Sequence, residues 1–461
     1  MTIAPPASSE STAPAGPRRE SLGRRVAKAG GWAVAGLGAS SVMRLGSNLV
    51  LTRLLNPAAF GLMSVATSLF YWVVMFTDLG INGSVMRSRE GANPSFLSTA
   101  FVIQLARNTG LAVLLVCVAL SIRPLQEAGV LKEGTVYADD RLPWFFAAIS
   151  LVIFIKGFDA IRIPLYQRDL KLAAITQLDL VSQGLGIVAM IACAWSGMGV
   201  YSLLAGLIVG ALIKTLGSHI WLKGPPISFR FDRTHFTEIF DYGKWVMLSS
   251  TLSAVVARGD QFLFGWFMPL SEFSLYAVAT IWIMAVKGLA DSIIHKVSYP
   301  LFAELHRERP ADIGRIYARL RLGADAAAAA LCVGIFLFAD FGIGLLYEER
   351  YQGVSHFMKL LAVGIMFKPF KLLHIIVLTA GESRRFLAAN ILASVALMIG
   401  TPIVYINFGL EPAIVYAAIS PIMALPYIRK AARKYAPISW WGELRAVVFA
   451  AAFAFVVVGA M

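Results

Sequence analysis

Three cations lie deep inside apolar stretches of this chain, where charged side chains are costly. Arg44 and Arg258 stand in two separate stretches, and Lys287 stands in a third, one helical turn before Asp291. Each arginine follows the start of its stretch by roughly 14 or 15 residues, so at a rise of about 1.5 Å per residue both reach a similar depth. Guanidinium groups match phosphate oxygens in charge and shape. We therefore expect an anion site that suits a phosphate or diphosphate group.

Further polar residues extend these cations into stripes with helical spacing. Ser40, Arg44, Ser47 and Asn48 share one face of the first apolar stretch. The stripes of later stretches are Thr67, Tyr71, Asp78 and Asn82; Thr251, Arg258 and Gln261; and Thr280, Met284, Asp291 and His295. Such stripes avoid lipid only by facing one another across water, so we expect a hydrated central cavity. The predicted anion-binding residues are Arg44, Asn48, Arg258, Lys287 and Arg107, with Lys214 extending the positive field.

The same residues have alternative roles. Internal ion pairs could join Lys287 to Asp291, Arg258 to Asp260 or Asp78, and Lys156 to Asp159. Asp78, Asp291 and His295 could instead bind a coupling proton or sodium ion. The sequence leaves both alternatives open.

Composition indicates the class of protein that must position these residues. The chain has 461 residues, of which 58% are hydrophobic and 15% are charged, and its mean hydropathy is +0.70. With continuous apolar runs of about twenty residues, these values predict an all-α polytopic membrane protein and exclude an ordinary soluble one. Cys117, Cys193 and Cys332 lie in apolar runs without metal-ligand spacing, and the sequence has no Walker motif. We expect no metal, cofactor or catalytic centre.

The apolar runs predict thirteen membrane spans. They are roughly 30–52, 60–86, 97–120, 143–161, 173–194, 199–222, 243–264, 272–295, 322–346, 354–379, 386–407, 411–428 and 443–461. The loops on one side contain only Arg53, Arg123, Lys132, Arg141 and Arg350, whereas clusters of basic residues occupy the loops on the other. Because cytoplasmic loops are enriched in Lys and Arg, this asymmetry predicts a cytoplasmic N-terminus. It also accounts for the net charge of +14 without nucleic acid as a partner.

One segment of the chain occurs twice. Phe60-Gly-Leu-Met-Ser-Val-Ala-Thr67 reappears as Phe273-Ser-Leu-Tyr-Ala-Val-Ala-Thr280, and the same offset of 213 positions relates Asp78 to Asp291. The copies begin at the first and seventh spans, so both enter the membrane in the same direction. This duplication predicts two six-helix lobes related by a pseudo-two-fold axis along the membrane normal, plus one extra C-terminal helix.

The predicted organisation has five parts. Residues 1–28 form a disordered, basic N-terminal tail that lacks the features of a cleaved signal peptide. Residues 29–222 and 243–428 form the two lobes. Residues 223–242 form a cytoplasmic linker, either an amphipathic helix on the inner leaflet or a solvated connector. Residues 429–461 contain the extra C-terminal helix.

The repeated segments resemble a known family. RLLNPAAFGLMSVATSLFYWVVMFTDLGINGSVMR is similar to the first hairpin of the polysaccharide-biosynthesis (Wzx-type) oligosaccharide flippases, which carry a Leu-x-Pro-x-x-Phe-Gly pattern followed by Asp-Leu-Gly. RGDQFLFGWFMPLSEFSLYAVAT, followed by SYPLFAEL, resembles the start of the family's second lobe. These flippases belong to the multidrug/oligosaccharidyl-lipid/polysaccharide exporter superfamily.

The resemblance implies a function and partners. It implies a multi-pass protein of the bacterial cytoplasmic (inner) membrane that moves polyprenyl-diphosphate-linked oligosaccharides across the bilayer for exopolysaccharide, capsule or O-antigen synthesis. The two lobes would rock between inward-open and outward-open states while the lipid tail stays in the bilayer. The implied partners are the lipid-linked oligosaccharide, the lipid bilayer, and the polysaccharide polymerase and export machinery.

Two other functions compete with this interpretation. A cation-coupled multidrug antiporter needs deep acidic residues for cationic substrates, whereas the deep residues here are mainly basic. A membrane glycosyltransferase or polymerase needs catalytic carboxylates, for which Asp139 and Asp140 in an outer loop are the candidates. That loop, 121–143, is short and has no second catalytic cluster, so we expect a transporter and not an enzyme.

Overall fold

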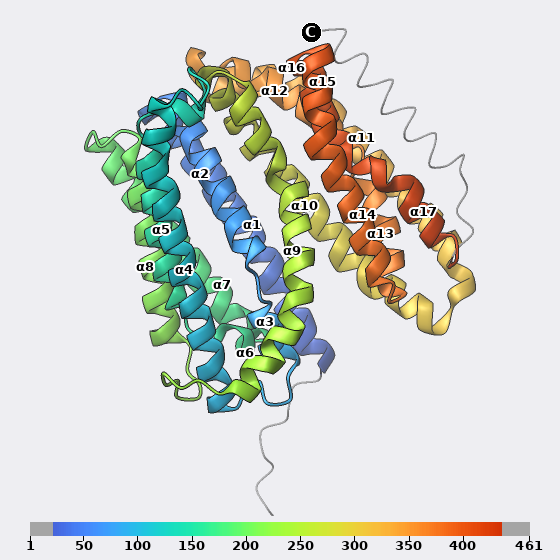
Figure 1. Ribbon diagram of the computed structural model, residues 1–461. Coiled ribbons are helices and arrows are strands. Elements are labelled where there is room, and N and C mark those ends of the chain that lie inside the picture. Colours follow the sequence, from blue (N-terminus) through green and yellow to red (C-terminus); the bar gives the residue numbers. More distant parts are fainter. Residues whose placement is uncertain (1–21, 436–461) are drawn as a thin grey trace, which may run out of the picture.

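The computed structural model describes residues 22–435, which fold into helices joined by turns and loops, arranged as two lobes (Figure 1). The N-terminal lobe contains α1 (Leu22–Leu54), α2 (Pro57–Phe76), α3 (Ile81–Arg87), α4 (Pro94–Glu127), α5 (Leu142–Gly157), α6 (Ile163–Arg168), α7 (Leu172–Trp195) and α8 (Tyr201–Trp221). The C-terminal lobe contains α9 (Arg233–Phe267), α10 (Leu270–Glu308), α11 (Ile313–Leu346), α12 (Gly353–Ala362), α13 (Lys371–Thr379), α14 (Ser383–Val395), α15 (Thr401–Phe408), α16 (Leu410–Ile419) and α17 (Leu425–Ala432). The predicted thirteenth span, 443–461, lies outside the described residues.

Most of these helices have the length and composition of membrane spans. Within residues 22–435, ten helical segments are long and apolar enough to cross a membrane. α5 is a shorter apolar helix, and α9 is 35 residues long but carries charged residues along its length. When α2–α3, α12–α13, α14–α15 and α16–α17 are each counted as one segment and the short α6 is left out, each lobe has six segments.

The duplication predicted from the sequence is present in the structure. The offset of 213 positions relates the last residue of α1, Leu54, to the last residue of α9, Phe267. It also relates the 3-10 helix η1 (Val136–Ala138) to η3 (Glu349–Tyr351). Because the same offset holds from the first to the fourth segment, the two lobes are copies of one unit. The prediction of an all-α membrane protein with two six-helix lobes is confirmed.

The two copies meet on their own symmetry axis. Gly61 of α2 and Ser274 of α10 are equivalent residues, and they are in contact: a Cβ built on Gly61 would lie 2.5 Å from the Ser274 Oγ and 3.4 Å from its Cα. Equivalent residues can touch only where the two-fold axis passes between them. The absence of a side chain at Gly61 therefore lets α2 and α10 cross closely.

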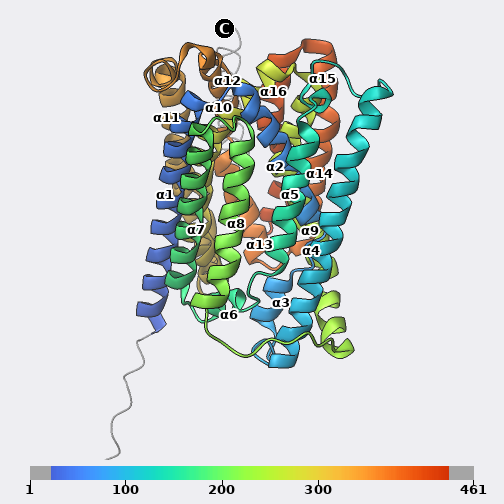
Figure 2. The ribbon, with the colours of Figure 1, turned by 90° about the vertical axis from the view of Figure 1, so that its left-hand side faces the viewer.

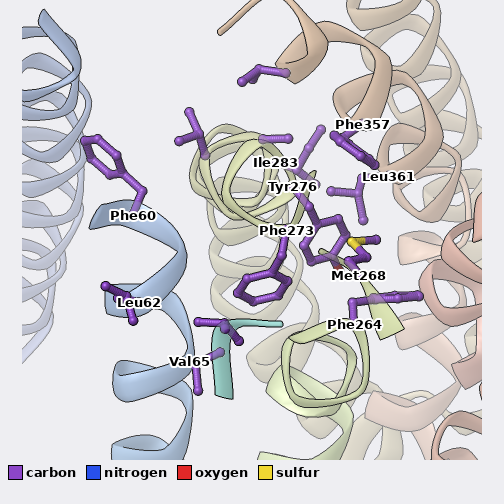
Figure 3. Close-up of a cluster of buried hydrophobic side chains, with 14 of the residues drawn as sticks. Phe60, Leu62, Val65, Phe264, Met268, Phe273, Tyr276, Ile283, Phe357 and Leu361 are labelled. Atoms are coloured by element: carbon purple, nitrogen blue, oxygen red, sulfur yellow. The ribbon is translucent and has the colours of Figure 1, made fainter. Parts of the chain in front are cut away.

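Apolar side chains from both lobes pack around this crossing. Phe60, Leu62 and Val65 of α2 lie on one side, and Phe264, Met268, Phe273, Tyr276, Ile283, Phe357 and Leu361 of the C-terminal lobe lie on the other (Figure 3). All of these side chains are buried. Because lipid is as apolar as they are, close packing stabilises the contact within the membrane.

Polar contacts close the same end of the molecule. The Arg350 guanidinium of η3 donates hydrogen bonds to the backbone oxygens of Thr52 and Arg53, at 3.1 and 3.2 Å, and the Tyr351 hydroxyl donates to the Leu55 oxygen at 2.8 Å. These oxygens belong to the last turn of α1 and the residue after it, where carbonyls have no partner within the helix. A cation there also interacts favourably with the helix dipole. The C-terminal lobe thus caps the first helix of the N-terminal lobe.

The lobes diverge toward the other end, where α1 begins (Figure 1). α9 stays with the N-terminal lobe along this half: the Ser250 hydroxyl donates to the Asp78 carboxylate at 3.1 Å, and the His235 Nε2 lies 2.9 Å from the Glu90 carboxylate. α1 packs on α7, and α7 on α8, away from this junction (Figure 2). The lobes therefore contact each other directly at one end. Toward the other end, α9 of the C-terminal lobe packs against the N-terminal lobe.

Two predicted boundaries need correction. The span predicted as 60–86 is not one helix, because α2 ends at Phe76 and α3 begins at Ile81. Gly80, between them, has a φ of 57°, a left-handed conformation that favours glycine. The predicted linker, 223–242, is also divided: α9 begins at Arg233, and the Arg162 guanidinium binds the backbone oxygens of Leu222 and Pro225 before it.

The crossing of α2 and α10 predicts the effect of a single methyl group. Gly61→Ala should destabilise the closed end, because overpacking costs about 1–3 kcal/mol and the new Cβ meets the Ser274 Oγ. Removing that oxygen in Gly61→Ala with Ser274→Ala should recover much of the loss. Thermal unfolding of the purified variants, followed by size-exclusion chromatography, measures both effects. Equal stability of the single and double variants would contradict the direct contact.

Candidate functional site

The two predicted arginines lie on equivalent helices of the two lobes, α1 and α9. Arg44 is exposed and Arg258 is partly exposed. Ten and nine residues separate them from the ends of their helices, which corresponds to about 15 and 14 Å of helix, so both lie at similar depth. Their charges act on one another across the junction of the lobes. The structure thus places these two predicted residues at similar depth, near enough for their charges to interact.

Arg258 is held by a buried polar group. Its guanidinium lies 3.4 Å from the side-chain oxygen of Gln261, one turn further along α9. The same oxygen accepts hydrogen bonds from the hydroxyls of Ser64, at 3.1 Å, and Ser68, both on α2. The Tyr71 ring lies 6.0 Å from the Arg258 guanidinium carbon, within cation–π range. The α2–α9 interface therefore orients this arginine.

The carboxylates proposed as internal partners of Arg258 are engaged elsewhere. The Tyr276 hydroxyl donates a hydrogen bond to Asp260 at 2.5 Å. Asp78 accepts bonds from the Gly80 amide and the Ser250 hydroxyl, at 3.0 and 3.1 Å. Among the described residues, no carboxylate forms an ion pair with Arg44 or Arg258, although the charge of Asp260 acts on Arg258 from further away. Both guanidinium groups remain available to an anion.

Two other predicted binding residues have structural contacts instead. Asn48 is buried, and its side-chain oxygen accepts a hydrogen bond of 2.6 Å from the Tyr347 hydroxyl, which joins the two lobes. Arg107 of α4 donates to the Val74 backbone oxygen at 2.8 Å and to the Thr77 hydroxyl at 3.2 Å. It thereby satisfies a carbonyl at the end of α2. The structure does not bring either residue to the arginine pair.

Lys287 lies in a second group of charges, inside the C-terminal lobe. Asp291, one turn later on α10, forms ion pairs of 2.8 Å with both Lys368 and Lys371. The sequence analysis did not predict a role for Lys368 and Lys371. Their signal was the sequence Lys368-Pro369-Phe370-Lys371 in the middle of an apolar span, since proline there interrupts a helix and two lysines at membrane depth need a reason.

The three candidate coupling residues have different environments. Asp78 lies in the turn between α2 and α3, and Asp291 lies between two lysines. Each carboxylate therefore has donors already in place. The side chain of His295 lies outside the part of the chain that the structure describes.

The N-terminal lobe has its own charged group. Lys214 of α8 pairs with Asp179 of α7 at 2.8 Å, and Asp159 accepts a hydrogen bond of 2.6 Å from the Thr215 hydroxyl. The ammonium of Lys156 lies 5.0 Å from the centre of the Phe70 ring. Lys156 interacts electrostatically with Asp159, but no ion pair joins them in the described residues.

The carboxylates of the loop before α5 are not arranged as a catalytic pair. Asp139 accepts from the Arg141 backbone amide at 2.8 Å and forms an ion pair of 2.6 Å with its guanidinium. Burial opposes ionisation of Asp139, but these bonds and the charge of Arg141 hold its pKa below the ordinary value. No cluster of His, Cys, Asp and Glu suited to a metal occurs among residues 22–435 as described.

The sequence matches a known protein family and individual proteins. Residues 50–356 match the model of the family described as polysaccharide biosynthesis protein. The chain is 21% identical over 334 residues to the succinoglycan biosynthesis transport protein ExoT of Rhizobium meliloti, covering 72% of this chain and 65% of that protein. It is also 21% identical over 352 residues to a putative O-antigen transporter of Shigella flexneri, covering 74% of this chain and 82% of that protein.

Solved structures share the fold at low identity. The inward-facing form of a multidrug resistance MATE transporter of the MOP superfamily matches with a TM-score of 0.63 and 16% identity, covering 88% of this chain and 95% of that one. The lipid II flippase MurJ, in an inward closed conformation, matches with a TM-score of 0.60 and 13% identity, covering 90% of this chain and 91% of that one. The family match covers more than half of the chain, and the chain therefore belongs to the polysaccharide biosynthesis protein family.

Proposed function

We propose that this protein is a flippase that moves polyprenyl-diphosphate-linked oligosaccharides across the bacterial cytoplasmic membrane. Family membership and the MurJ-like fold support an exporter role in polysaccharide biosynthesis. The observation that carries the finer proposal is the pair Arg44 and Arg258, two arginines at similar depth on opposite lobes with no carboxylate paired to either among the described residues. Two guanidinium forks at one depth suit the two phosphates of a diphosphate.

The mechanism follows from how the lobes touch. In this proposal the divergent end faces the cytoplasm, and the diphosphate head reaches Arg44 and Arg258 from there while the polyprenyl tail stays in lipid. Export then requires the contacts at the other end to separate, among them Gly61 with Ser274 and Arg350 with the end of α1. Neutralising the arginine charges by the diphosphate lowers the cost of bringing the lobes together around the cargo.

The competing functions have less support. A multidrug antiporter for cationic substrates would need free deep carboxylates, whereas Asp78, Asp260 and Asp291 all have donors. A polymerase would need a catalytic pair, whereas Asp139 is held by Arg141. We therefore propose a transporter without an enzymatic activity, whose partners are the lipid-linked oligosaccharide, the bilayer and the polymerase and export machinery.

Removing either arginine charge should weaken cargo binding. Arg44→Gln and Arg258→Gln should each lower the affinity for a polyprenyl-diphosphate-linked saccharide at least about tenfold, because hydrogen bonds to charged groups contribute about 1.5–3 kcal/mol. Native mass spectrometry of the purified protein with added lipid measures the bound fraction. Arg141→Gln, in an outer loop, is the matched control and should bind as the wild type does. Wild-type binding by both membrane variants would refute the assignment.

The orientation can be tested with single cysteines. In a background without Cys117, Cys193 and Cys332, a Lys223→Cys variant should resist an impermeant thiol reagent added to intact cells, because the α8–α9 connector is proposed to be cytoplasmic. A Glu133→Cys variant, in the loop before α5, should react. Labelling of the first and protection of the second would reverse the proposed topology.

A further inference from the structure

The C-terminal lobe contains a group of charges that the arginine pair does not explain. We call Lys287, Lys368, Lys371 and Asp291 the lysine cluster. The two carboxylate oxygens of Asp291 are each 2.8 Å from a different lysine, Oδ2 from Lys368 and Oδ1 from Lys371. The lysines thus hold one carboxylate from two sides, an arrangement that fits any two-oxygen anion.

A break in the membrane segment builds this cluster. α12 ends at Ala362, and α13 begins only at Lys371, with short 3-10 helices at Val363–Ile365 and Lys368–Phe370 between them. Pro369 cannot donate a backbone hydrogen bond, so a regular helix cannot continue through it. Broken helices at membrane depth are tolerated where protein buries them or where they line a water-filled cavity, because their backbone needs other partners than lipid.

Lys287 reaches this break from α10. A Cβ on Gly364 would lie 3.1 Å from the Lys287 Nζ and 2.8 Å from the Ala418 backbone oxygen, so only glycine leaves room for the ammonium between α10, the break and α16. The charges of Asp260 and Asp291 act on Lys287 from a distance. No hydrogen bond or ion pair joins its ammonium to any side chain that the structure describes.

Counting charges shows that the cluster has an excess of cations. Three lysines face one aspartate, Asp291. The charge of Asp260 on α9 also acts on Lys287 from a distance, so three lysines still outnumber the two carboxylates that act on them.

The equivalent region of the N-terminal lobe provides an internal comparison. Lys156 and Lys214 are matched there by Asp159 and Asp179. Unbalanced charge inside a membrane protein is costly, and an anionic ligand removes that cost. This region of the N-terminal lobe therefore has no such excess of cations.

We propose that the lysine cluster is a second anion site, which binds a phosphate or carboxylate group in the position that Asp291 now occupies. Asp291 then acts as a built-in competitor, because an incoming anion must displace it from Lys368 and Lys371. The side chains of Asp291 and Lys371 are 28% and 39% exposed, so the cluster lies partly at the surface of the protein.

The position of the cluster suggests its place in transport. Lys287 is 17 residues from the start of α10, about 26 Å of helix, whereas Arg258 is about 14 Å from the end of α9 at the same face of the membrane. If the proposed function is correct, the cluster lies about 12 Å nearer the cytoplasmic side than the arginine pair. It would meet an anionic group of the cargo first, and the arginines would receive it later.

The test measures binding of radiolabelled inorganic pyrophosphate to the purified full-length protein. Asp291→Asn should strengthen binding at least about tenfold, because it removes the competitor and leaves both lysines. Lys368→Gln with Lys371→Gln should weaken it at least tenfold, and Lys287→Met should weaken it while keeping the side-chain volume. Lys359→Gln is the matched control, because this lysine of α12 is already paired with Asp340 at 2.5 Å.

The outcomes separate this proposal from the proposed function. Opposite changes in Asp291→Asn and the double lysine variant support the second site, even if the wild type binds no polyprenyl-diphosphate lipid in native mass spectrometry, which would make the site one for free anions. Bound lipid that the double lysine variant loses would identify the cargo as the source. Pyrophosphate affinity that is unchanged in Asp291→Asn and in all lysine variants, with each variant eluting as folded protein, would overturn the proposal.

Discussion

The close crossing of α2 and α10 is the contact on which the arrangement of the lobes depends. Gly61 and Ser274 are the same position in two copies of one unit, and they touch because the symmetry axis passes between them. The crossing holds the lobes together at one end, and in the proposed transport cycle this contact must separate. Apolar side chains from α2, α9, α10 and α12 surround it, and Arg350 and Tyr351 close the end beyond it. Every contact that must open in the proposed transport cycle lies near this point.

Charge within the membrane follows a consistent rule: most ionisable groups have a partner, and the exceptions are the residues that we propose as anion-binding groups. Asp78, Asp260, Lys214 and Arg107 all contact groups that satisfy them. Arg44, Arg258 and Lys287 do not pair with a carboxylate among the described residues. A charge at membrane depth without a partner lowers stability, so its presence in a folded protein points to function.

The two copies have diverged in the features that matter for a cargo. Gln261 is the equivalent of Asn48, and both are buried acceptors that join the lobes, Gln261 with Ser64 and Asn48 with Tyr347. The charged groups, however, are not symmetric. The N-terminal lobe has a helix break beside Asp78, whereas the C-terminal lobe has its break beside three lysines. Such asymmetry is expected of a carrier whose two lobes contact different parts of one molecule.

The sequence by itself determined the fold class, the duplication and the depth of the arginines. These follow from apolar runs of spanning length, from the offset of 213 that relates Phe60 to Phe273, and from the constant rise of a helix, all of which are local or periodic properties. The apolar run 272–295 also placed Lys287 and Asp291 inside a predicted membrane span.

Only the tertiary structure decided which of these residues face one another. Helical spacing predicted that Asn48 shares the face of Arg44, but the Asn48 side chain accepts a hydrogen bond from Tyr347. Tyr347 follows α11, almost 300 positions away in the chain, so spacing along α1 could not reveal this contact. Arg107 proved to be the cap of α2, and Lys368 and Lys371 joined Asp291 across a broken helix that the apolar pattern had hidden. Spacing defines a face on one helix, whereas the contact of two faces depends on how several helices pack, and that is why the sequence could find the charges but not their partners.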